Sequence, residues 1–472
     1  MLTNNPGPND GPAAASTQAG TPLYPPAITP PEAPLPLLKF LRQFPKNPLR
    51  SVPRGAYEQD IFVLRAKTLN VAYAWITGPE LIEEILIRRA GALNKSRVEK
   101  QVFDRSVGDS VLTADGARWR WQRRVLAPLF RHQEIIAYVP RMSQAAEQHI
   151  AVWQASGPGL RNVEEDMTQA TLAVIMRSML GNSDAGVATR IMAATEAYLS
   201  KASWEAAYAI IRMPNWVPHP GTWRMIRSAR TLRSIMADLI AERRAIGGAD
   251  DDLLGRLLAA RDPETDEPMH EKGLINNVST LLLAGHETTA KALTWTLYLL
   301  ARAPEWQRAV REEVARVAGG NRIGAEHIDQ LQITTRILKE SMRLYPPAPV
   351  VARVNTEFIR AGDENLPVGS NLVFPVYAIH RHRKYWQDPD RFDPDRFLPE
   401  NEKRIPRTQY MPFGAGPRIC IGQAFAMIEA VTLLASFIRA AEFDWDGKHK
   451  PEPISRITLR PAGGMPLLVR PL

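Results

Sequence analysis

The residues with the clearest chemical potential lie in the stretch FGAGPRICIG, residues 413–422, which holds the only cysteine of the 472 residues. A single cysteine forms no internal disulfide and cannot share a cysteine-rich zinc or iron–sulfur site. It can be an inert buried thiol, a nucleophile or a single thiolate ligand of a metal. The glycines of this stretch allow a tight loop that directs amide hydrogens toward a sulfur anion. With Arg418 nearby, the loop is predicted to keep Cys420 ionised beneath a flat, metal-bearing cofactor.

A second polar group interrupts an apolar helix in the stretch AGHETT, residues 284–289. Thr288 follows Ala284 by four residues, so its hydroxyl can bond the Ala284 carbonyl and loosen the helix. The groove formed beside Glu287 would suit a small ligand and proton transfer, whereas the alternative is a satisfied polar kink. A zinc-protease helix is excluded, because position 290 is alanine and the second histidine is missing.

Two further motifs contain charges that can pair. Glu340 and Arg343 are three residues apart in KESMR, so they face the same side of a helix. An exposed pair of this kind is worth only about 0–1 kcal/mol. A structural role requires burial and a second guanidinium, for which Arg396 in PDRF is the candidate.

A basic run lies in GARWRWQRRVLAPLFRHQ, residues 116–133, which has five arginines and no acid. Such a run with tryptophans can contact nucleic acid, an anionic membrane, an acidic protein or an anionic cofactor, or it can be a solvated helix face.

Composition limits the class of protein. Hydrophobic residues make up 45% and charged residues 23%, as in ordinary globular chains, and the net charge of +9 is a mild excess. The lack of cysteine pairs favours a reducing compartment, which predicts a cytoplasmic location. No secretory signal and no uncharged apolar stretch long enough for a bilayer occurs, so a soluble protein without an integral membrane anchor is expected.

The chain is predicted to have two parts. Residues 1–35 contain many prolines and only two charged residues, and they are expected to be an extended or disordered tail. Residues 36–472 show no internal repeat or second linker and are expected to be a single catalytic domain.

Most of that domain has helical patterns, with few strand patterns. Helices are predicted from Pro304 to the glycine pair at 319–320, over 329–345 up to Pro346, and around 228–244 and 254–262. Strands are predicted over 60–66, 70–77, 370–379 and in the C-terminal segment after 453. The fold class is therefore mainly α with small β-sheets.

Taken together, AGHETT, ESMR, PDRF and FGAGPRICIG follow the order of motifs in the cytochrome P-450 superfamily, haem-thiolate monooxygenases that this chain resembles from about residue 35 to its end. The resemblance implies a triangular helical prism with the haem between a long central helix and the helix after the cysteine loop.

Site residues carried over from the resemblance surround a haem b. Cys420 would be the axial thiolate, beside Phe413, and thiolate donation favours cleavage of an O–O bond. Arg418, Arg353 and the pair Trp119 and Arg123 would meet the propionates. Glu340, Arg343 and Arg396 would form the family's structural ion triad.

The resemblance places proton delivery on the other side of the haem. Ala284 would lie against the haem there, with Thr288 and Glu287 supplying protons during O2 activation. The implied reaction inserts one oxygen atom of O2 into an organic substrate, by hydroxylation or epoxidation, and releases the other as water.

Substrate contacts are expected from 98–107, Ala284, 348–351 and the turn at 462–465. Residues 203–223 should form a lid bearing Trp204, Tyr208, Trp216 and Trp223, and these aromatics suggest an apolar fatty acid, terpenoid or aromatic substrate. Packing of the same aromatics on the body is the alternative.

Electrons are expected from a separate partner, since the chain continues only to Leu472 after Cys420 and shows no fused flavin or ferredoxin domain. Arg118, Arg120 and Arg124 would dock an acidic ferredoxin or flavodoxin supplied by its own reductase, and no nucleic acid is expected as a partner.

Three other functions compete with this one. A peroxide-driven or isomerising haem-thiolate enzyme would need no redox partner, but it would have less use for Glu287 and Thr288. A cysteine hydrolase would use Cys420 with a histidine and would be colourless. A non-catalytic haem sensor would have no need of the proton-delivery motif.

Overall fold

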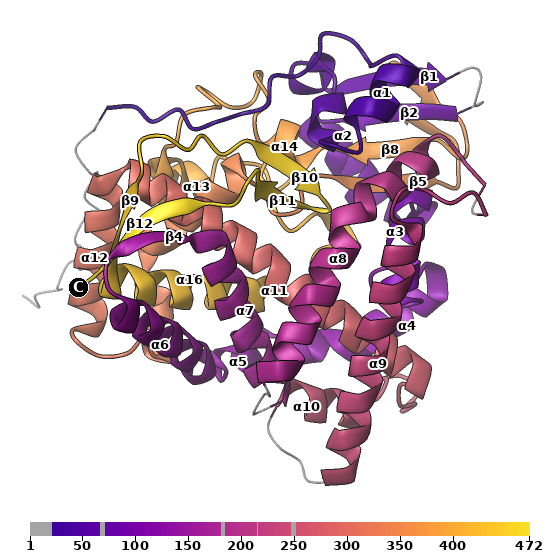
Figure 1. Ribbon diagram of the computed structural model, residues 1–472. Helices are drawn as coiled ribbons and strands as arrows, with labels where there is room; N and C mark the ends of the chain where they lie inside the picture. The colour runs from indigo at the N-terminus through magenta and orange to yellow at the C-terminus, as the bar shows by residue number, and fades with distance from the viewer. Residues whose placement is uncertain (1–20, 67–70, 181–184, 215, 247–251) are drawn as a thin grey trace, which may run out of the picture.

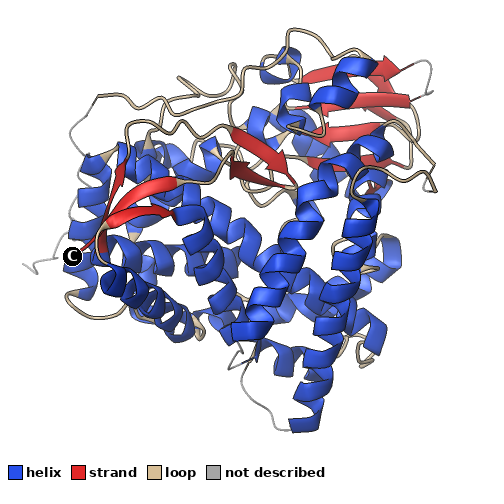
Figure 2. Ribbon diagram, in the orientation of Figure 1, coloured by secondary structure: helices blue, strands red, loops and turns tan. Residues whose placement is uncertain are grey.

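The computed structural model describes residues 21–66, 71–180, 185–214, 216–246 and 252–472. Helices form most of this part of the chain, and the strands lie in small sheets at its margins (Figures 1 and 2). The helices are α1 (Leu37–Gln43), α2 (Pro79–Ile82), α3 (Arg97–Val107), α4 (Gly116–Leu126), α5 (His132–Ile136), α6 (Val139–Ser156), α7 (Val163–Leu180), α8 (Ala185–Ile210), α9 (Thr222–Ile246), α10 (Leu253–Ala259), α11 (Glu271–Arg302), α12 (Pro304–Ala318), α13 (Gln332–Leu344), α14 (Val376–Ile379), α15 (Pro399–Glu402) and α16 (Gln423–Ala440).

The helix boundaries follow local signals in the sequence. α12 begins at Pro304, whose missing amide costs nothing in a first turn, and ends before Gly319, which has φ +58°. α13 ends just before the prolines at 346 and 347, as predicted. α3 begins with a capping box in which Ser96 and Glu99 satisfy each other's backbone amides.

α11 forms the centre of the molecule. It is 32 residues long and buried around nearly its whole circumference, which is the pattern of a helix inside a core. It packs against α7, α9, α13 and α16. Trp295 of α11 stacks on Tyr345 with 3.8 Å between ring centroids, which fixes α11 against the end of α13.

The strands form one larger sheet and three small ones. The strands are β1 (Ile61–Ala66), β2 (Val71–Ile76), β3 (Leu93–Lys95), β4 (Gly159–Asn162), β5 (Val351–Asn355), β6 (Ile359–Ala361), β7 (Glu364–Leu366), β8 (Asn371–Phe374), β9 (Ala441–Trp445), β10 (Pro453–Arg456), β11 (Thr458–Pro461) and β12 (Pro466–Pro471). The five-stranded sheet has the order β1-β2-β8-β5-β3, in which β2 and β8 are parallel and the other neighbours antiparallel. The remaining sheets are β4-β12-β9, β10-β11 and β6-β7.

The predicted strands near the two ends are confirmed, with one exception. The strand expected over 370–379 ends at Phe374, and Pro375 begins the short helix α14 instead. Proline has no amide to donate to a neighbouring strand, so it ends the pairing there.

The segment before α1 is anchored to the body at several points within the described residues. Leu23 pairs with Phe392, and the Ile28 amide donates to the Tyr377 hydroxyl at 3.1 Å. The Tyr345 hydroxyl donates to the Pro26 carbonyl at 2.7 Å. Residues 21–35 are therefore extended, as expected, and also anchored, while residues 1–20 of the predicted tail lie outside the described part.

One helix of the described residues, α16, is by length and composition apolar enough to cross a membrane, with a mean hydropathy of 1.4. Its residues are 67% buried inside the protein. A buried core helix meets the same criterion, and α16 packs on α6, α12 and α11.

Candidate active site

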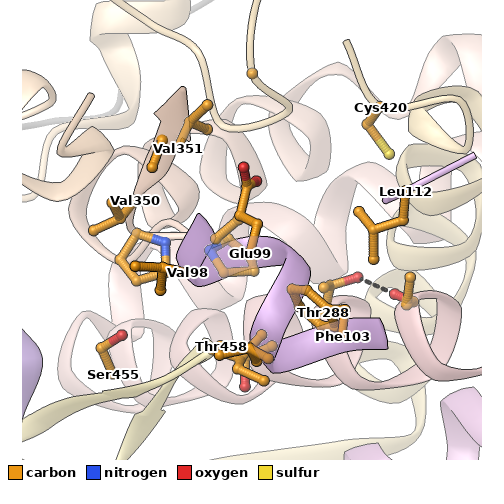
Figure 3. A pocket seen from close by; sticks show the side chains of 18 of the residues that line it. Val98, Glu99, Phe103, Leu112, Thr288, Val350, Val351, Cys420, Ser455 and Thr458 are labelled. Atoms are coloured by element: carbon orange, nitrogen blue, oxygen red, sulfur yellow. Dashed lines mark hydrogen bonds between the residues drawn. The ribbon is translucent and has the colours of Figure 1, made fainter. Parts of the chain in front are cut away.

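The Cys420 loop, residues 413–422, is closed by its own backbone. The Cys420 amide donates to the Phe413 carbonyl at 2.9 Å. Gly416 has φ +73°, and a Cβ there would lie 2.1 Å from the Leu86 carbonyl oxygen, so only glycine fits. The loop presents the Cys420 sulfur to a large cavity (Figure 3).

The thiol chemistry differs in part from the prediction. Burial raises the pKa of Cys420, and a hydrogen bond from the Gly422 amide and the charge of Arg123 offset only part of this effect. Arg418 is occupied elsewhere, because it pairs with Asp115 at 2.8 Å. The loop alone therefore does not keep the thiolate ionised. A coordinated metal would do so, because a ligating thiol loses its proton to the metal.

The cavity has a volume of about 1030 Å³. A pocket for one drug-sized ligand has roughly 300–1,000 Å³, so this one has room for more than a small ligand. It contains all the predicted catalytic and cofactor-binding residues, namely Trp119, Arg123, Ala284, Glu287, Thr288, Arg353, Phe413, Arg418 and Cys420.

On the α11 side of the cavity, the predicted hydrogen bond within AGHETT is confirmed, while α11 continues as an unbroken helix from Glu271 to Arg302. The Thr288 hydroxyl donates to the Ala284 carbonyl at 2.8 Å, and this bond is drawn in Figure 3. Gly285 has a packing role as well, since a Cβ there would lie 2.9 Å from Ile175 Cδ1 of α7. The close approach of α7 to α11 thus depends on the glycine of AGHETT.

Glu287 is held by charges. Its Oε1 accepts hydrogen bonds from Thr458 at 3.0 Å and from Arg460 Nη2 at 2.8 Å, and Lys291 Nζ lies 3.7 Å away. Burial alone would raise the pKa of Glu287, but Lys291 and Arg460, with smaller contributions from His286 and Thr458, hold it at about 2. The carboxylate is therefore ionised at neutral pH in this arrangement.

Another wall of the cavity bears the cationic cluster, Lys95, Arg353 and Arg418. Lys95 lies 3.2 Å and Arg353 3.3 Å from Glu99. Arg418 stacks over the Trp119 ring at 4.4 Å. Burial and the neighbouring arginines lower the pKa of Lys95 to about 8, although Glu99 opposes this.

These residues fit a haem. Three buried or half-buried cations face only two carboxylates, Glu99 and Asp115, so the wall retains positive charge for two propionates. Arg123 lies between this wall and the cysteine, since its Nη1 donates to the Ile419 carbonyl at 2.8 Å. A thiolate ligand, an open space above it and a basic edge are the features that a haem requires.

The predicted ion triad is confirmed and lies in the core. Arg343 Nε and Nη2 donate to the two oxygens of Glu340 at 2.6 and 2.7 Å, and both side chains are fully buried. Arg396 Nε lies 3.6 Å from Glu340.

Of the four segments expected to contact substrate, three line the cavity and one does not. Residues within 98–107, Ala284 and 348–351 line the cavity, whereas 462–465 do not. The β10–β11 hairpin takes the place of that turn, through Ser455, Ile457 and Thr458. β10 and β11 pair from Pro453 with Pro461 to Arg456 with Thr458, which leaves Ile457 at the tip of the hairpin.

The expected aromatic lid is also corrected. Trp216 and Trp223 are 82% and 78% exposed, and neither they nor Trp204 and Tyr208 line the cavity. The cavity wall contributed by this segment consists of Ser203, Ala206, Ile210 and Ile211.

Sequence reasoning missed several polar residues of the site. Lys95, Glu99 and Arg460 belong to no motif, and no local pattern in the sequence singles them out.

Comparison with known proteins identifies the family. The chain matches the cytochrome P-450 family over residues 29–467. It is 32% identical to cyclooctatin synthase of Streptomyces melanosporofaciens, covering 84% of each chain. It is 31% identical to a cytokinin hydroxylase of Arabidopsis thaliana, over 84% of this chain and 79% of that one.

A solved structure agrees with this assignment. The crystal structure of the haem domain of cytochrome P-450DA superposes with a TM-score of 0.77 at 26% identity, covering 88% of this chain and 90% of that chain. A helical body with small sheets is thus shared with the haem domain of a cytochrome P-450. The chain belongs to the cytochrome P-450 family and is an oxidoreductase of the monooxygenase type.

Proposed function

We propose that this enzyme inserts one atom of O2 into a bulky apolar substrate, using haem b bound through Cys420. The observation that carries the proposal is that Cys420, the cationic cluster and the hydrogen-bonded pair Ala284 and Thr288 line one cavity. When bound, the haem supplies the O2 chemistry, and the chain supplies position, exclusion of water and protons.

Each predicted site residue has a place in this proposal. Cys420 would bind the iron, and Phe413, at the start of the same loop, would lie beside the sulfur. Arg418, Arg353, Trp119 and Arg123, joined by Lys95, hold the two propionates by charge and hydrogen bonding.

Proton delivery is assigned to α11. The Thr288 hydroxyl, beside the Ala284 carbonyl, accepts and passes a proton, and the Glu287 carboxylate acts as the relay behind it. Because Glu287 is paired with Arg460, it must first give up part of that pairing.

The substrate class is inferred from the cavity wall. Aliphatic side chains of α3, α8 and α11 predominate, and Ser455 and Thr458 supply hydroxyls at the hairpin. Cyclooctatin synthase and cyclooctat-9-en-7-ol 5-monooxygenase, which is 30% identical, are among the relatives. An alicyclic terpenoid oxygenated at an aliphatic carbon suits these aliphatic helix faces, while aromatic side chains such as Tyr73, Trp75 and Phe103 line other parts of the cavity.

The electron donor is proposed to be an acidic ferredoxin or flavodoxin in the cytoplasm. Arg118 and Arg120 lie exposed on α4, the helix that Arg123 ties to the Cys420 loop. Arg118 is paired with Asp109 at 2.6 Å, and Arg124 is paired with Asp262 at 2.8 Å and with Glu264 at 3.2 Å, so Arg120 is the main candidate of the three.

The first test is the absorption spectrum of the dithionite-reduced protein under carbon monoxide, beside Cys420→Ala. A red-shifted Soret band that disappears in the variant supports the thiolate ligand. A protein without haem, or a spectrum that ignores the substitution, contradicts the proposal.

A second test addresses the substrate and the oxidant. Polycyclic terpenoids and planar aromatics of similar size are titrated into the ferric enzyme, and the spin-state change is recorded. Stronger binding of the aromatics contradicts the substrate class. Equal product yield with hydrogen peroxide alone and with the ferredoxin system would favour a peroxide-driven enzyme.

A further inference from the structure

Arg460 joins the interior of the active site to the helix that covers it. Its Nη2 donates to Glu287 Oε1 at 2.8 Å, and its Nη1 donates to Glu196 Oε2 at 2.8 Å. Glu196 belongs to α8, which supplies Leu199, Ala202 and Ser203 to the cavity wall. One guanidinium thus binds a buried carboxylate and a carboxylate that is 55% exposed.

The other cation near Glu287 is Lys291, which lies closer to another carboxylate. Lys291 lies 2.8 Å from Glu164 of α7 but 3.7 Å from Glu287. Arg460 is therefore the cation most closely engaged with Glu287. His286, the remaining titratable neighbour, stays neutral because burial lowers its pKa.

The β10–β11 hairpin that carries Arg460 is also fixed to the covering helices by its tip. Ile457 packs against the cluster formed by Tyr198, Leu199, Met225 and Ala229 of α8 and α9. Its φ of +81° is unfavourable for a β-branched residue, so the surrounding contacts must hold it there. Thr458, one residue further on, donates to Glu287 and lines the cavity in Figure 3.

These contacts form one connected path. A displacement of α8 would act on the hairpin through Ile457 and on Arg460 through Glu196. Thr458 of the hairpin and Arg460 both donate hydrogen bonds to Glu287. A relay near neutral pH works best when its proton affinity matches the medium, and a carboxylate bound to a guanidinium binds protons too weakly.

We propose that Arg460 is a positioning residue that divides its guanidinium between Glu287 and Glu196, so that the seating of α8 sets how readily Glu287 relays protons. This inference rests on the proposed role of Glu287. In each transfer Glu287 takes one proton from solvent and gives one proton toward Thr288, and its charge is restored.

A direct test measures the protonation of Glu287 without turnover. Infrared difference spectra of the haem-loaded protein are recorded against pH, with Glu287→Gln as the reference in each background. In Arg460→Met the midpoint of the Glu287 carboxyl band should rise by about 1–3 pH units, as expected when an adjacent opposite charge is removed. Arg460→Lys, which keeps the charge, should stay near the wild type.

The kinetic test uses Glu196→Gln, whose position is exposed enough to spare the fold. With Glu196 neutralised, the Arg460 guanidinium keeps Glu287 as the one charged carboxylate of the two. O2 consumption with a ferredoxin system should then slow by about two- to fivefold, the effect of one exposed ion pair, and its solvent isotope effect should grow. Glu442→Gln removes a carboxylate from another half-exposed ion pair, on β9, and should change neither quantity.

The outcomes separate the two proposals. An unchanged Glu287 midpoint in Arg460→Met, or a Glu196→Gln enzyme that behaves like Glu442→Gln, overturns the role of Arg460. A wild-type solvent isotope effect in Glu287→Gln instead removes Glu287 from proton delivery, whatever the infrared titration shows.

Discussion

Arg343 lies fully buried in the core, and each of its N–H groups has an acceptor. Two bonds go to Glu340, and three go to the carbonyl oxygens of His380, Pro389 and Arg391. A charge so deep in the protein is tolerated only because these partners replace water. The ESMR motif is thus a folding element that joins α13 to the segment before the Cys420 loop.

Removal of the carboxylate should be costly. Glu340→Gln leaves Arg343 uncompensated, and we expect it to lower the free energy of unfolding by about 3–5 kcal/mol. Urea unfolding followed by circular dichroism measures the change. Glu402→Gln, in a partly exposed pair with Lys339, is the control and should cost no more than about 1 kcal/mol. Equal effects of the two substitutions would show that burial of the pair does not matter.

His380 connects this ion pair to the cysteine loop. Its Nε2 accepts from the Met411 amide at 2.9 Å, and its Nδ1 lies 3.2 Å from the Arg343 carbonyl, as a donor. Burial and the charge of Arg343 lower the pKa of His380 to about 3, so the ring is neutral.

This histidine predicts acid sensitivity. Because the pKa is lowered on folding, its contribution to stability is complete above pH 6.5 and is lost as the pH falls toward 3. The free energy of unfolding should fall by up to about 1.4 kcal/mol per pH unit from this group. In His380→Gln the free energy of unfolding near pH 7 should be lower. Its dependence on pH between about 6.5 and 3 should be flatter than in the wild type. An unchanged slope in His380→Gln would contradict the assignment. The control is His132→Gln, at an exposed position, which should keep the wild-type slope.

At the scale of elements, the Cys420 loop offers a matched pair of glycines. Gly414 and Gly416 have φ +78° and +73°, but only at Gly416 would a Cβ meet another group within 4 Å, the Leu86 carbonyl at 2.1 Å. The left-handed backbone costs an L-residue roughly 1–2 kcal/mol at either position.

Gly416→Ala should therefore displace the loop and reduce the haem content of the purified protein severely. Gly414→Ala bears only the backbone cost and should retain most of its haem. The ratio of Soret absorbance to protein absorbance measures both variants. Similar haem contents in the two would mean that the approach to Leu86 does not limit the loop.

At the scale of the whole molecule, the net charge of +9 bears on the proposed docking of an acidic electron donor. Arg120 lies exposed on α4, near the cysteine loop, whereas Arg316 lies exposed on α12 at the opposite side of Figure 1. Charge near a docking site mainly affects the rate of association and its salt dependence.

Arg120→Glu should slow reduction by an acidic ferredoxin at low salt, and the difference from wild type should shrink as salt is added. Stopped-flow reduction under carbon monoxide gives the rate. Arg316→Glu makes the same change in net charge and should leave the rate nearly unaltered. If both variants slow reduction equally, overall charge rather than a docking face on α4 is responsible.

Short-range sequence features determined the family, the cysteine proposed as the iron ligand and many element boundaries. The Cys420 loop, the hydrogen bond from Thr288 to Ala284 and the ends of α12 and α13 depend on residues within a few positions of one another, where glycine, proline and hydroxyl groups act directly on the backbone. These features could be predicted from the residues alone. The strand expected through Pro375 failed because the local apolar pattern ignores the missing amide.

Only the tertiary structure decided which charges meet in the cavity and which residues line it. Arg460 lies 173 positions from Glu287, and Lys95 meets Arg353 and Arg418 from separate elements. Trp216 and Trp223, expected over the cavity, lie exposed, and the Ile457 tip of the hairpin lines the cavity in place of the turn at 462–465. Such contacts depend on how helices and sheets pack over long separations, and that packing is set by the sum of many burial and hydrogen-bond energies rather than by any local pattern.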